Sequence, residues 1–219
     1  LAVRQVKFNF SVPLPDWFHR EDYWQSFFDL MAQARINSIG FWDYHPFPHM
    51  IRFRQYPEAV VLSPEQTERN LRTWSMIFRL ARQRGLTTWL INWNIHLPEP
   101  FAKAHGLRVK GEDSPIVRRY MRYCVAETLK TYPDLTGIGV CAGEQMPSED
   151  YDWREQWIKD TFVAGIRDSG RTLPLLHRYW WTSSDSIQRL LCADYPGPLW
   201  VSVKFNGEQH MPLTPGEYT

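Results

Sequence analysis

The stretch SPEQTERNLRTWSMIFRLARQRGLTTWLINWNIH, residues 63–96, decides the fold class. After Ser63 and Pro64, which are typical of a helix start, apolar residues recur three and four apart and predict a helix. Gly85 is typical of a helix end. The segment 87–92 is rich in β-branched and aromatic residues and predicts a strand, and polar residues follow it at once. A helix, a short turn, a strand and a polar strand end are typical of one unit of an α/β protein.

The rest of the chain repeats this unit. We predict strands at residues 6–10, 38–42, 87–92, 136–141, 173–177 and 199–204, and helices at residues 21–34, 63–85, 114–133, 152–169 and 184–191. Strand followed by helix, repeated, predicts a parallel sheet with helical crossovers. The long, polar segments follow the strands, and the short ones precede them, which favours the (β/α)8 or TIM barrel. The sequence has no GxGxxG motif and no P-loop, so a nucleotide-binding sheet lacks its signature.

The length is short for such a barrel. The chain has 219 residues and a mass of 26.0 kDa, whereas a complete barrel takes about 250 residues. We therefore predict a single domain over residues 1–219, a truncated TIM barrel with about six βα units. Six strands alone would leave two open parallel edges, so we expect the last two units to be missing from this chain.

Charge and hydropathy exclude several classes of protein. The 25 basic and 24 acidic residues give a net charge of +1, which provides no electrostatic reason to bind nucleic acid or an anionic membrane. No stretch is long and apolar enough to span a bilayer. No signal peptide is visible, and the sequence is compatible with a location in the cytoplasm or in the periplasm. It does not indicate an oligomeric state. The three cysteines fit no zinc spacing, so we expect reduced thiols.

Tryptophan is unusually frequent, with 11 residues. Indole rings pack well against the flat CH faces of sugars, and they also fill aromatic cores. Trp42, Trp93, Trp180 and Trp181 fall at or beside predicted strand ends, where a barrel binds its substrate. These four residues predict a site for an oligo- or polysaccharide.

Two glutamates are the candidate catalytic residues. Glu144 follows an apolar strand and two small residues, with no Lys or Arg among its nearest neighbours. A carboxyl in such a partly dry place can have the raised pKa that a general acid needs, although a helix-capping or exposed glutamate would have the same neighbours. Glu208 follows the sixth strand and is the candidate for the second carboxylate that glycoside hydrolysis requires, with an ordinary loop residue as the alternative. Asp43 is a third candidate.

The other strand ends supply hydrogen-bonding and aromatic groups. The candidate substrate-binding residues are Asp43, His45, Asn92, Trp93, Asn94, His96, His177, Arg178, Trp180, Lys204, Asn206 and His210. Arg178 and Lys204 indicate an acidic sugar such as a uronate, unless they pair with the nearby glutamates. The histidines could in principle converge on zinc. The HxH pair usual in barrel metallohydrolases is absent from the first strand, however, so we predict no metal and no cofactor.

Four segments carry a resemblance to a known family: residues 36–42, 45–49, 90–96 and 135–144. Together they resemble barrel glycoside hydrolases, especially the α-glucuronidase-like group and its bacterial relatives. The resemblance implies a general acid at the end of the fourth strand, which corresponds to Glu144. In the α-glucuronidases the loop after the sixth strand carries an Asp in a Lys-Asn-Gly context. Here the segment KFNGE, residues 204–208, has similar surroundings but offers Glu208 at a shifted position.

These observations predict a glycosidase. Glu144 would protonate the leaving oxygen, and Glu208, or a residue beyond Thr219, would act as base or nucleophile. A carbohydrate-binding barrel without catalysis is one alternative, because it keeps the aromatic residues and lacks the second carboxylate. A metal-dependent barrel hydrolase or isomerase that uses the strand-end histidines is the other.

Overall fold

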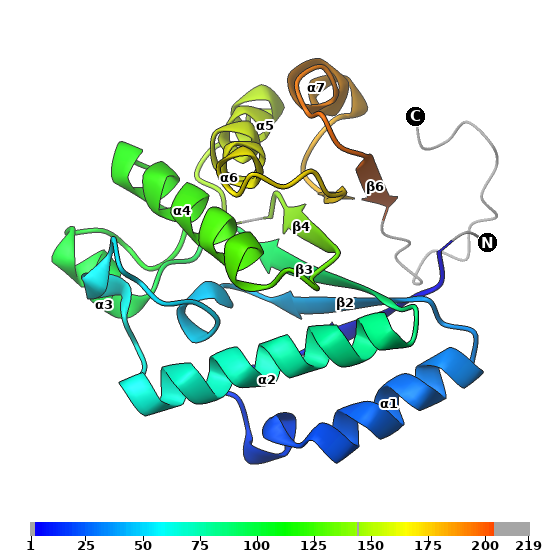
Figure 1. Cartoon of the computed structure of the whole chain (residues 1–219). Coiled ribbons are helices and arrows are strands. Elements are labelled where there is room, and N and C mark those ends of the chain that lie inside the picture. The colour runs from blue at the N-terminus through cyan, green and yellow to red at the C-terminus, as the bar shows by residue number, and fades with distance from the viewer. Residues whose placement is uncertain (1–2, 144, 204–219) are drawn as a thin grey trace, which may run out of the picture.

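The strands form one parallel sheet. The computed structural model describes residues 3–143 and 145–203. Its strands are β1 (Gln5–Asn9), β2 (Ser38–Asp43), β3 (Thr87–Trp93), β4 (Gly137–Cys141), β5 (Leu175–Tyr179) and β6 (Leu199–Val203). Each strand pairs in parallel with the next along the chain. The sheet curls into part of a barrel (Figure 1), and the described residues supply six of the eight strands of the (β/α)8 fold, as predicted.

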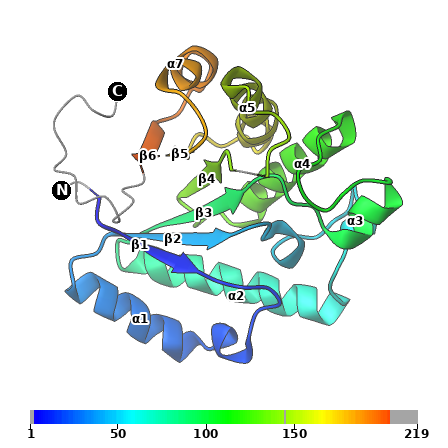
Figure 2. The same ribbon diagram turned by 180° about the vertical axis from the view of Figure 1, so that it is seen from behind.

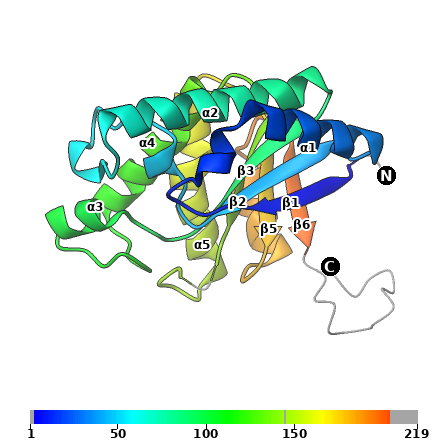
Figure 3. The same cartoon turned by 90° about the horizontal axis from the view of Figure 1, so that it is seen from below.

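Helices cover the convex side of the sheet (Figures 1 and 2). They are α1 (Glu21–Gln33), α2 (Pro64–Gln83), α3 (Glu99–Ala104), α4 (Pro115–Thr131), α5 (Tyr151–Ile158), α6 (Ala164–Asp168) and α7 (Ser184–Ile187). A π-helical segment, Lys159–Val163, joins α5 to α6, and another, Gln188–Cys192, continues α7. Short 3-10 helices lie at Asp16–His19, Phe47–His49 and Pro57–Ala59. Helices α1 and α2 lie side by side outside β1 to β3 (Figure 3). In the part of the chain that the structure describes, no helix is long and apolar enough to cross a membrane.

The ends of α2 show how local sequence sets the elements. The Ser63 hydroxyl accepts a hydrogen bond from the Gln66 amide (3.2 Å), and the Gln66 side chain accepts one from the Ser63 amide (3.0 Å). This reciprocal pair satisfies two donors that a helix N-terminus leaves unpaired. Gly85 follows the helix with a φ of +70°, a conformation that residues with a side chain rarely adopt.

Several elements differ from the sequence prediction, among them the helix predicted at residues 152–169, which the π-helical segment divides into α5 and α6. Strand β5 starts at Leu175 rather than at 173, because Pro174 precedes it and has no N–H to donate to the sheet. The strand ends at Tyr179, so His177 and Arg178 lie within it rather than after it. Helix α3 lies in a segment that was predicted as a loop. The sequence does not predict this helix because six residues are too few to show a helical period.

The two faces of the sheet bury different residues. Phe41 and Leu90 face the helices and belong to the large apolar core that fills the space between sheet and helices. The neighbouring Trp42 and Ile91 face the concave side, because side chains alternate along a strand. A second, smaller cluster lies on that side and consists of Trp42, Trp89, Ile91, Cys141 and Leu176, with Trp93 and Trp180 packed against it.

Glycines of β4 make room for this concave cluster. A Cβ added to Gly137 would overlap the ring of Trp89, and one added to Gly139 would lie 2.7 Å from Ile91 Cγ1. Just beyond the strand, a Cβ on Gly143 would overlap the indole nitrogen of Trp93. The large side chains of β3 therefore lie directly over the glycines of β4, where only a residue without a side chain allows so close an approach.

Candidate active site

A cavity of about 300 Å³ opens at the carboxyl ends of β1, β2 and β3. It is lined by Lys7, Asn9, Phe10, Trp42, Asp43, Tyr44 and Trp93. Active sites of TIM-barrel enzymes lie at this end of the strands. The cavity combines aromatic surfaces with a few polar groups, as small-molecule sites commonly do.

Two cations lie close to the ring of Trp42 on the concave face. Lys7 Nζ lies 4.5 Å from the centre of the indole ring, and Arg178 Cζ lies 5.2 Å from it. The buried Nε of Arg178 makes no hydrogen bond within the described residues. Trp42 is only 7% exposed, so the part of its ring that lines the cavity is small, and the two cations beside it can bind an acidic group on a sugar.

Asp43 is an acidic residue that lines this cavity. Burial raises the pKa of its carboxyl group, and the backbone N–H groups of Tyr44 and His45 offset part of that effect. The His45 amide donates to Asp43 Oδ1 at 2.9 Å. A partly buried carboxylate held in this way can accept hydrogen bonds from sugar hydroxyls.

Tyr44, Asn92 and His96 form one wall beside the cavity. Asn92 Nδ2 donates to the Tyr44 carbonyl oxygen at 2.7 Å, and the rings of Tyr44 and His96 lie 4.8 Å apart. Burial, with Lys110 nearby, lowers the pKa of His96 to about 4, so its imidazole is neutral at pH 7. Asn92 thus fixes the backbone that presents Tyr44 to the cavity.

Asn94 lies deeper, at the junction of β3 and β4. Its Nδ2 donates to the Cys141 carbonyl oxygen at 3.3 Å. The Oδ1 atoms of Asn94 and Asn92, like Nε2 of His96, are buried and accept no hydrogen bond within the described residues. These three atoms are unsatisfied polar groups next to the candidate site.

Two predicted site residues lie in the helical layer instead. His45 Nε2 lies 2.9 Å from the Tyr120 hydroxyl, and burial lowers the pKa of His45 to about 3. His177 is fully buried, and its Nε2 lies 3.0 Å from Glu155 Oε2. Thr182 donates a further hydrogen bond to the Glu155 carboxylate. Neither histidine lines the cavity. The alternation along a strand turns His177 towards the helices, and the contact with Tyr120 holds His45 against α4.

Of the other predicted residues, some lie near the cavity, one is exposed, and five lie outside the described residues. Trp93 lines the cavity and Trp180 packs against the concave cluster, so the structure brings both of them close to Trp42. Trp181, which follows β5, is 45% exposed. The candidates outside the described residues are Glu144, Lys204, Asn206, Glu208 and His210.

Four residues at this edge, Lys7, Asn9, Phe10 and Arg154, were not predicted from the sequence. Lys7 and Asn9 face the concave side of β1 and line the cavity. Their alternation with Val6 and Phe8 is a signal that could have identified them. Arg154 of α5 is buried and donates to the Gly143 carbonyl oxygen at 3.0 Å, a contact across eleven residues that no local pattern shows.

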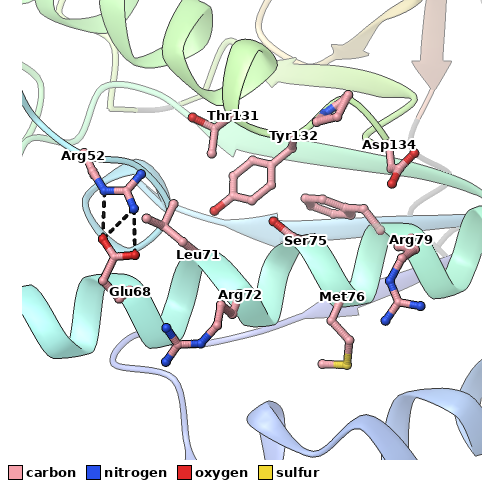
Figure 4. Close-up of a pocket in the computed structure, with 12 residues that line it drawn as sticks. Arg52, Glu68, Leu71, Arg72, Ser75, Met76, Arg79, Thr131, Tyr132 and Asp134 are labelled. Atoms are coloured by element: carbon pink, nitrogen blue, oxygen red, sulfur yellow. Dashed lines mark hydrogen bonds and ion pairs between the residues drawn. The ribbon is translucent and has the colours of Figure 1, made fainter.

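A larger cavity, of about 550 Å³, lies on the helical side (Figure 4). Arg72, Ser75 and Arg79 of α2 line it opposite Tyr132 and Asp134. Arg52 and Glu68, which form an ion pair, close one end. This cavity lies outside the sheet, so the smaller cavity at the strand ends is the better candidate for an active site.

The histidines do not form a metal centre within residues 3–143 and 145–203. No group of three or more His, Cys, Asp or Glu side chains is placed there to hold a metal ion. His45 instead contacts Tyr120, and His177 contacts Glu155, both within the same chain.

Comparisons with known proteins place this fold among glycoside hydrolases. No protein-family model matches the sequence, and no curated protein matches it. A solved GH138 enzyme targeting pectin rhamnogalacturonan II is 26% identical, with a TM-score of 0.85 over 93% of this chain. The chain spans about a third of that enzyme's length, since the match covers 32% of it.

More distant structures share the barrel. The GH20 β-N-acetylhexosaminidase from Streptomyces coelicolor A3(2) is 13% identical, with a TM-score of 0.57 over 92% of this chain and 48% of its own. Dispersin B is 9% identical, with a TM-score of 0.63 over 95% of this chain and 67% of its own. The resemblance to α-glucuronidase-like enzymes is not confirmed by these matches. The chain therefore has the barrel fold of glycoside hydrolases, and 93% of the chain is similar to part of a GH138 enzyme.

Proposed function

We propose that this protein takes part in hydrolysis of a glycosidic bond in an acidic, pectin-type saccharide. The observation that carries the proposal is the pair of cations, Lys7 and Arg178, close to the ring of Trp42, which lines a cavity at the strand ends. The exposed part of the indole ring, with Trp93, offers aromatic contact to a sugar at the cavity, and the two cations fit a carboxylate on that sugar. The similarity to a GH138 enzyme that targets pectin rhamnogalacturonan II supports the same class of substrate.

Glu144 is the proposed general acid. It follows Gly143 directly in the chain, just beyond the carboxyl end of β4. In the proposed reaction its carboxyl group protonates the leaving oxygen as the glycosidic bond breaks. A second carboxylate activates water or attacks the sugar, and Glu208 is the proposed residue for that step.

The sugar contacts are proposed for residues at the cavity. Asp43 would accept hydrogen bonds from hydroxyls, and Trp93 would add a second aromatic surface. His96 would act as a neutral hydrogen-bonding group, because burial lowers its pKa to about 4. Asn92 and Asn94 support the same edge through their bonds to backbone carbonyls.

The test measures sugar release from rhamnogalacturonan II by chromatography. Glu144→Gln removes the proton donor and keeps the shape, so we expect turnover to fall by about 10²–10⁴-fold. Glu149→Gln is the matched control, because Glu149 is an exposed glutamate five residues further along the chain. We expect this control to match the wild type.

A Glu144→Gln variant with full turnover would contradict the assignment of the general acid. A wild-type protein that binds the saccharide in calorimetry but releases no sugar would instead support the non-catalytic carbohydrate-binding barrel.

A further inference from the structure

We propose that Arg154 is a positioning residue, which holds the backbone on both sides of Glu144. The inference rests on the proposed role of Glu144 as general acid. Arg154 lies on α5, outside the cavity, and its side chain is only 2% exposed. A guanidinium group is costly to bury unless its N–H groups find acceptors.

The acceptors are backbone carbonyls of the segment that leaves β4. Arg154 Nη1 donates to the Gly143 carbonyl oxygen at 3.0 Å and lies 3.5 Å from that of Ala142. Arg154 Nε donates to the Ser148 carbonyl oxygen at 2.7 Å. One rigid guanidinium group therefore joins residues 142–143 to residue 148, and Glu144 lies between them in the sequence.

Other contacts hold the same segment from the sheet side. The Trp93 indole packs so closely over Gly143 that a Cβ would not fit there. The Met146 amide donates to the Gly143 carbonyl oxygen at 3.2 Å. With Arg154 on one side and Trp93 on the other, the chain is fixed immediately before Glu144.

Position matters for a general acid because the proton must move over a hydrogen-bond distance to the leaving oxygen. A misplacement of about 1 Å, caused by a residue remote from the chemistry, can lower turnover by about 10²-fold. Loss of Arg154 should therefore lower kcat and leave KM little changed, since the saccharide surface on Trp42 belongs to other strands.

The chain contains a matched control in Arg171. Its guanidinium group also donates to backbone carbonyl oxygens: Nη1 to those of Leu129 and Tyr132 (3.0 Å each), and Nη2 to those of Pro133 (3.2 Å) and Leu135 (2.7 Å). These carbonyls precede β4, at the end of the sheet opposite the cavity. Arg171→Ala should therefore remove a comparable set of hydrogen bonds without moving Glu144.

The experiment compares Arg154→Ala and Arg171→Ala in the complete protein, well below the unfolding temperature of each variant. On rhamnogalacturonan II we expect Arg154→Ala to lower kcat by about 10²-fold and Arg171→Ala to leave it unchanged. A second substrate is the 2,4-dinitrophenyl glycoside of the sugar that the wild type releases. Its leaving group needs no proton, so kcat/KM of Arg154→Ala, which reports cleavage of the glycosidic bond and not the later attack of water, should return to within a few-fold of the wild type. Equal loss of kcat/KM on both substrates would overturn the inference, because a merely structural defect does not depend on the leaving group.

Hydrogen exchange tests the same inference without activity. We expect Arg154→Ala to speed the exchange of the amides in residues 143–148, and Arg171→Ala to speed exchange in residues 129–135 instead. Unchanged exchange at 143–148 would overturn the role of Arg154 even in an active enzyme. A wild type that hydrolyses no saccharide would refute the proposed function, and the exchange rates would still decide whether Arg154 holds this segment.

Discussion

The two ends of β4 are built from the same two features, but only one end leads to the cavity. At the amino end, Gly137 lies under Trp89, and Arg171 donates to the carbonyls that precede the strand. Beyond the carboxyl end, Gly143 lies under Trp93, and Arg154 donates to the carbonyls that follow it. Trp93 lines the cavity, whereas Trp89 is buried against Trp200.

This comparison separates stability from function. Both ends need close packing and satisfied carbonyls for the strand to hold its place. In TIM barrels the amino end serves stability, and the carboxyl end also carries the chemistry. Matched substitutions at the two ends should therefore have similar effects on folding and different effects on the saccharide.

The largest effect on stability is expected for Trp89→Ala. Trp89 is 3% exposed, and truncating a buried Trp costs about 3–5 kcal/mol of unfolding free energy. Trp93→Ala should cost less because Trp93 is only half-buried. Urea denaturation measures both changes, and calorimetry measures saccharide binding. We expect Trp93→Ala to weaken binding and Trp89→Ala to leave it intact at temperatures where the variant is folded. The reverse pattern would contradict the distinction between the two ends.

The glycines provide a second, smaller test. An added methyl group at Gly137 or Gly143 overlaps an indole ring, and such overpacking costs about 1–3 kcal/mol. Denaturation midpoints should fall for both Gly137→Ala and Gly143→Ala. Turnover of rhamnogalacturonan II should fall for Gly143→Ala alone. Its added methyl group overlaps Trp93, so the backbone at residue 143, directly before Glu144, has to shift. Wild-type turnover in a folded Gly143→Ala variant would show that this close contact has no role in activity.

Acid should weaken the carboxyl end of the sheet. Burial lowers the pKa of His96 from 6.5 to about 4, so the unfolded chain takes up a proton near pH 6.5 that the folded protein takes up only near pH 4. Stability should therefore fall as the pH drops from 6.5 to 4, and this contribution should level off below pH 4. We expect several degrees of the fall in Tm over this range, about 2–4 °C for each kcal/mol lost, to disappear in His96→Gln. An identical slope in the variant would exclude His96 as a source of the pH dependence.

The sequence predicted the order of the strands and the main helices because their causes are local. The Ser63 cap and the period of α2 lie within one segment, and so does the run of β-branched and aromatic residues in β3. The number of strands and the position of the polar strand ends followed from these patterns.

The side of the sheet to which an individual side chain points was harder to predict. A shift of two residues at the start of β5 left His177 inside the strand, where it turns to Glu155 in the helical layer. The contacts of Arg154 depend on how α5 packs back onto β4, which no periodicity shows. Lys7 was overlooked because its role depends on Trp42 of the neighbouring strand.

The most direct test of the account is saccharide binding at Trp42. Calorimetry with fragments of rhamnogalacturonan II should use the Glu144→Gln background, so that no turnover intervenes. Trp42→Ala should lower affinity by about tenfold or more, which corresponds to about 1.4 kcal/mol. Trp17→Ala is the control, because Trp17 is exposed among the helices, and it should bind as tightly as the parent. Undiminished affinity in a folded Trp42→Ala variant would contradict the placement of the sugar on the concave face.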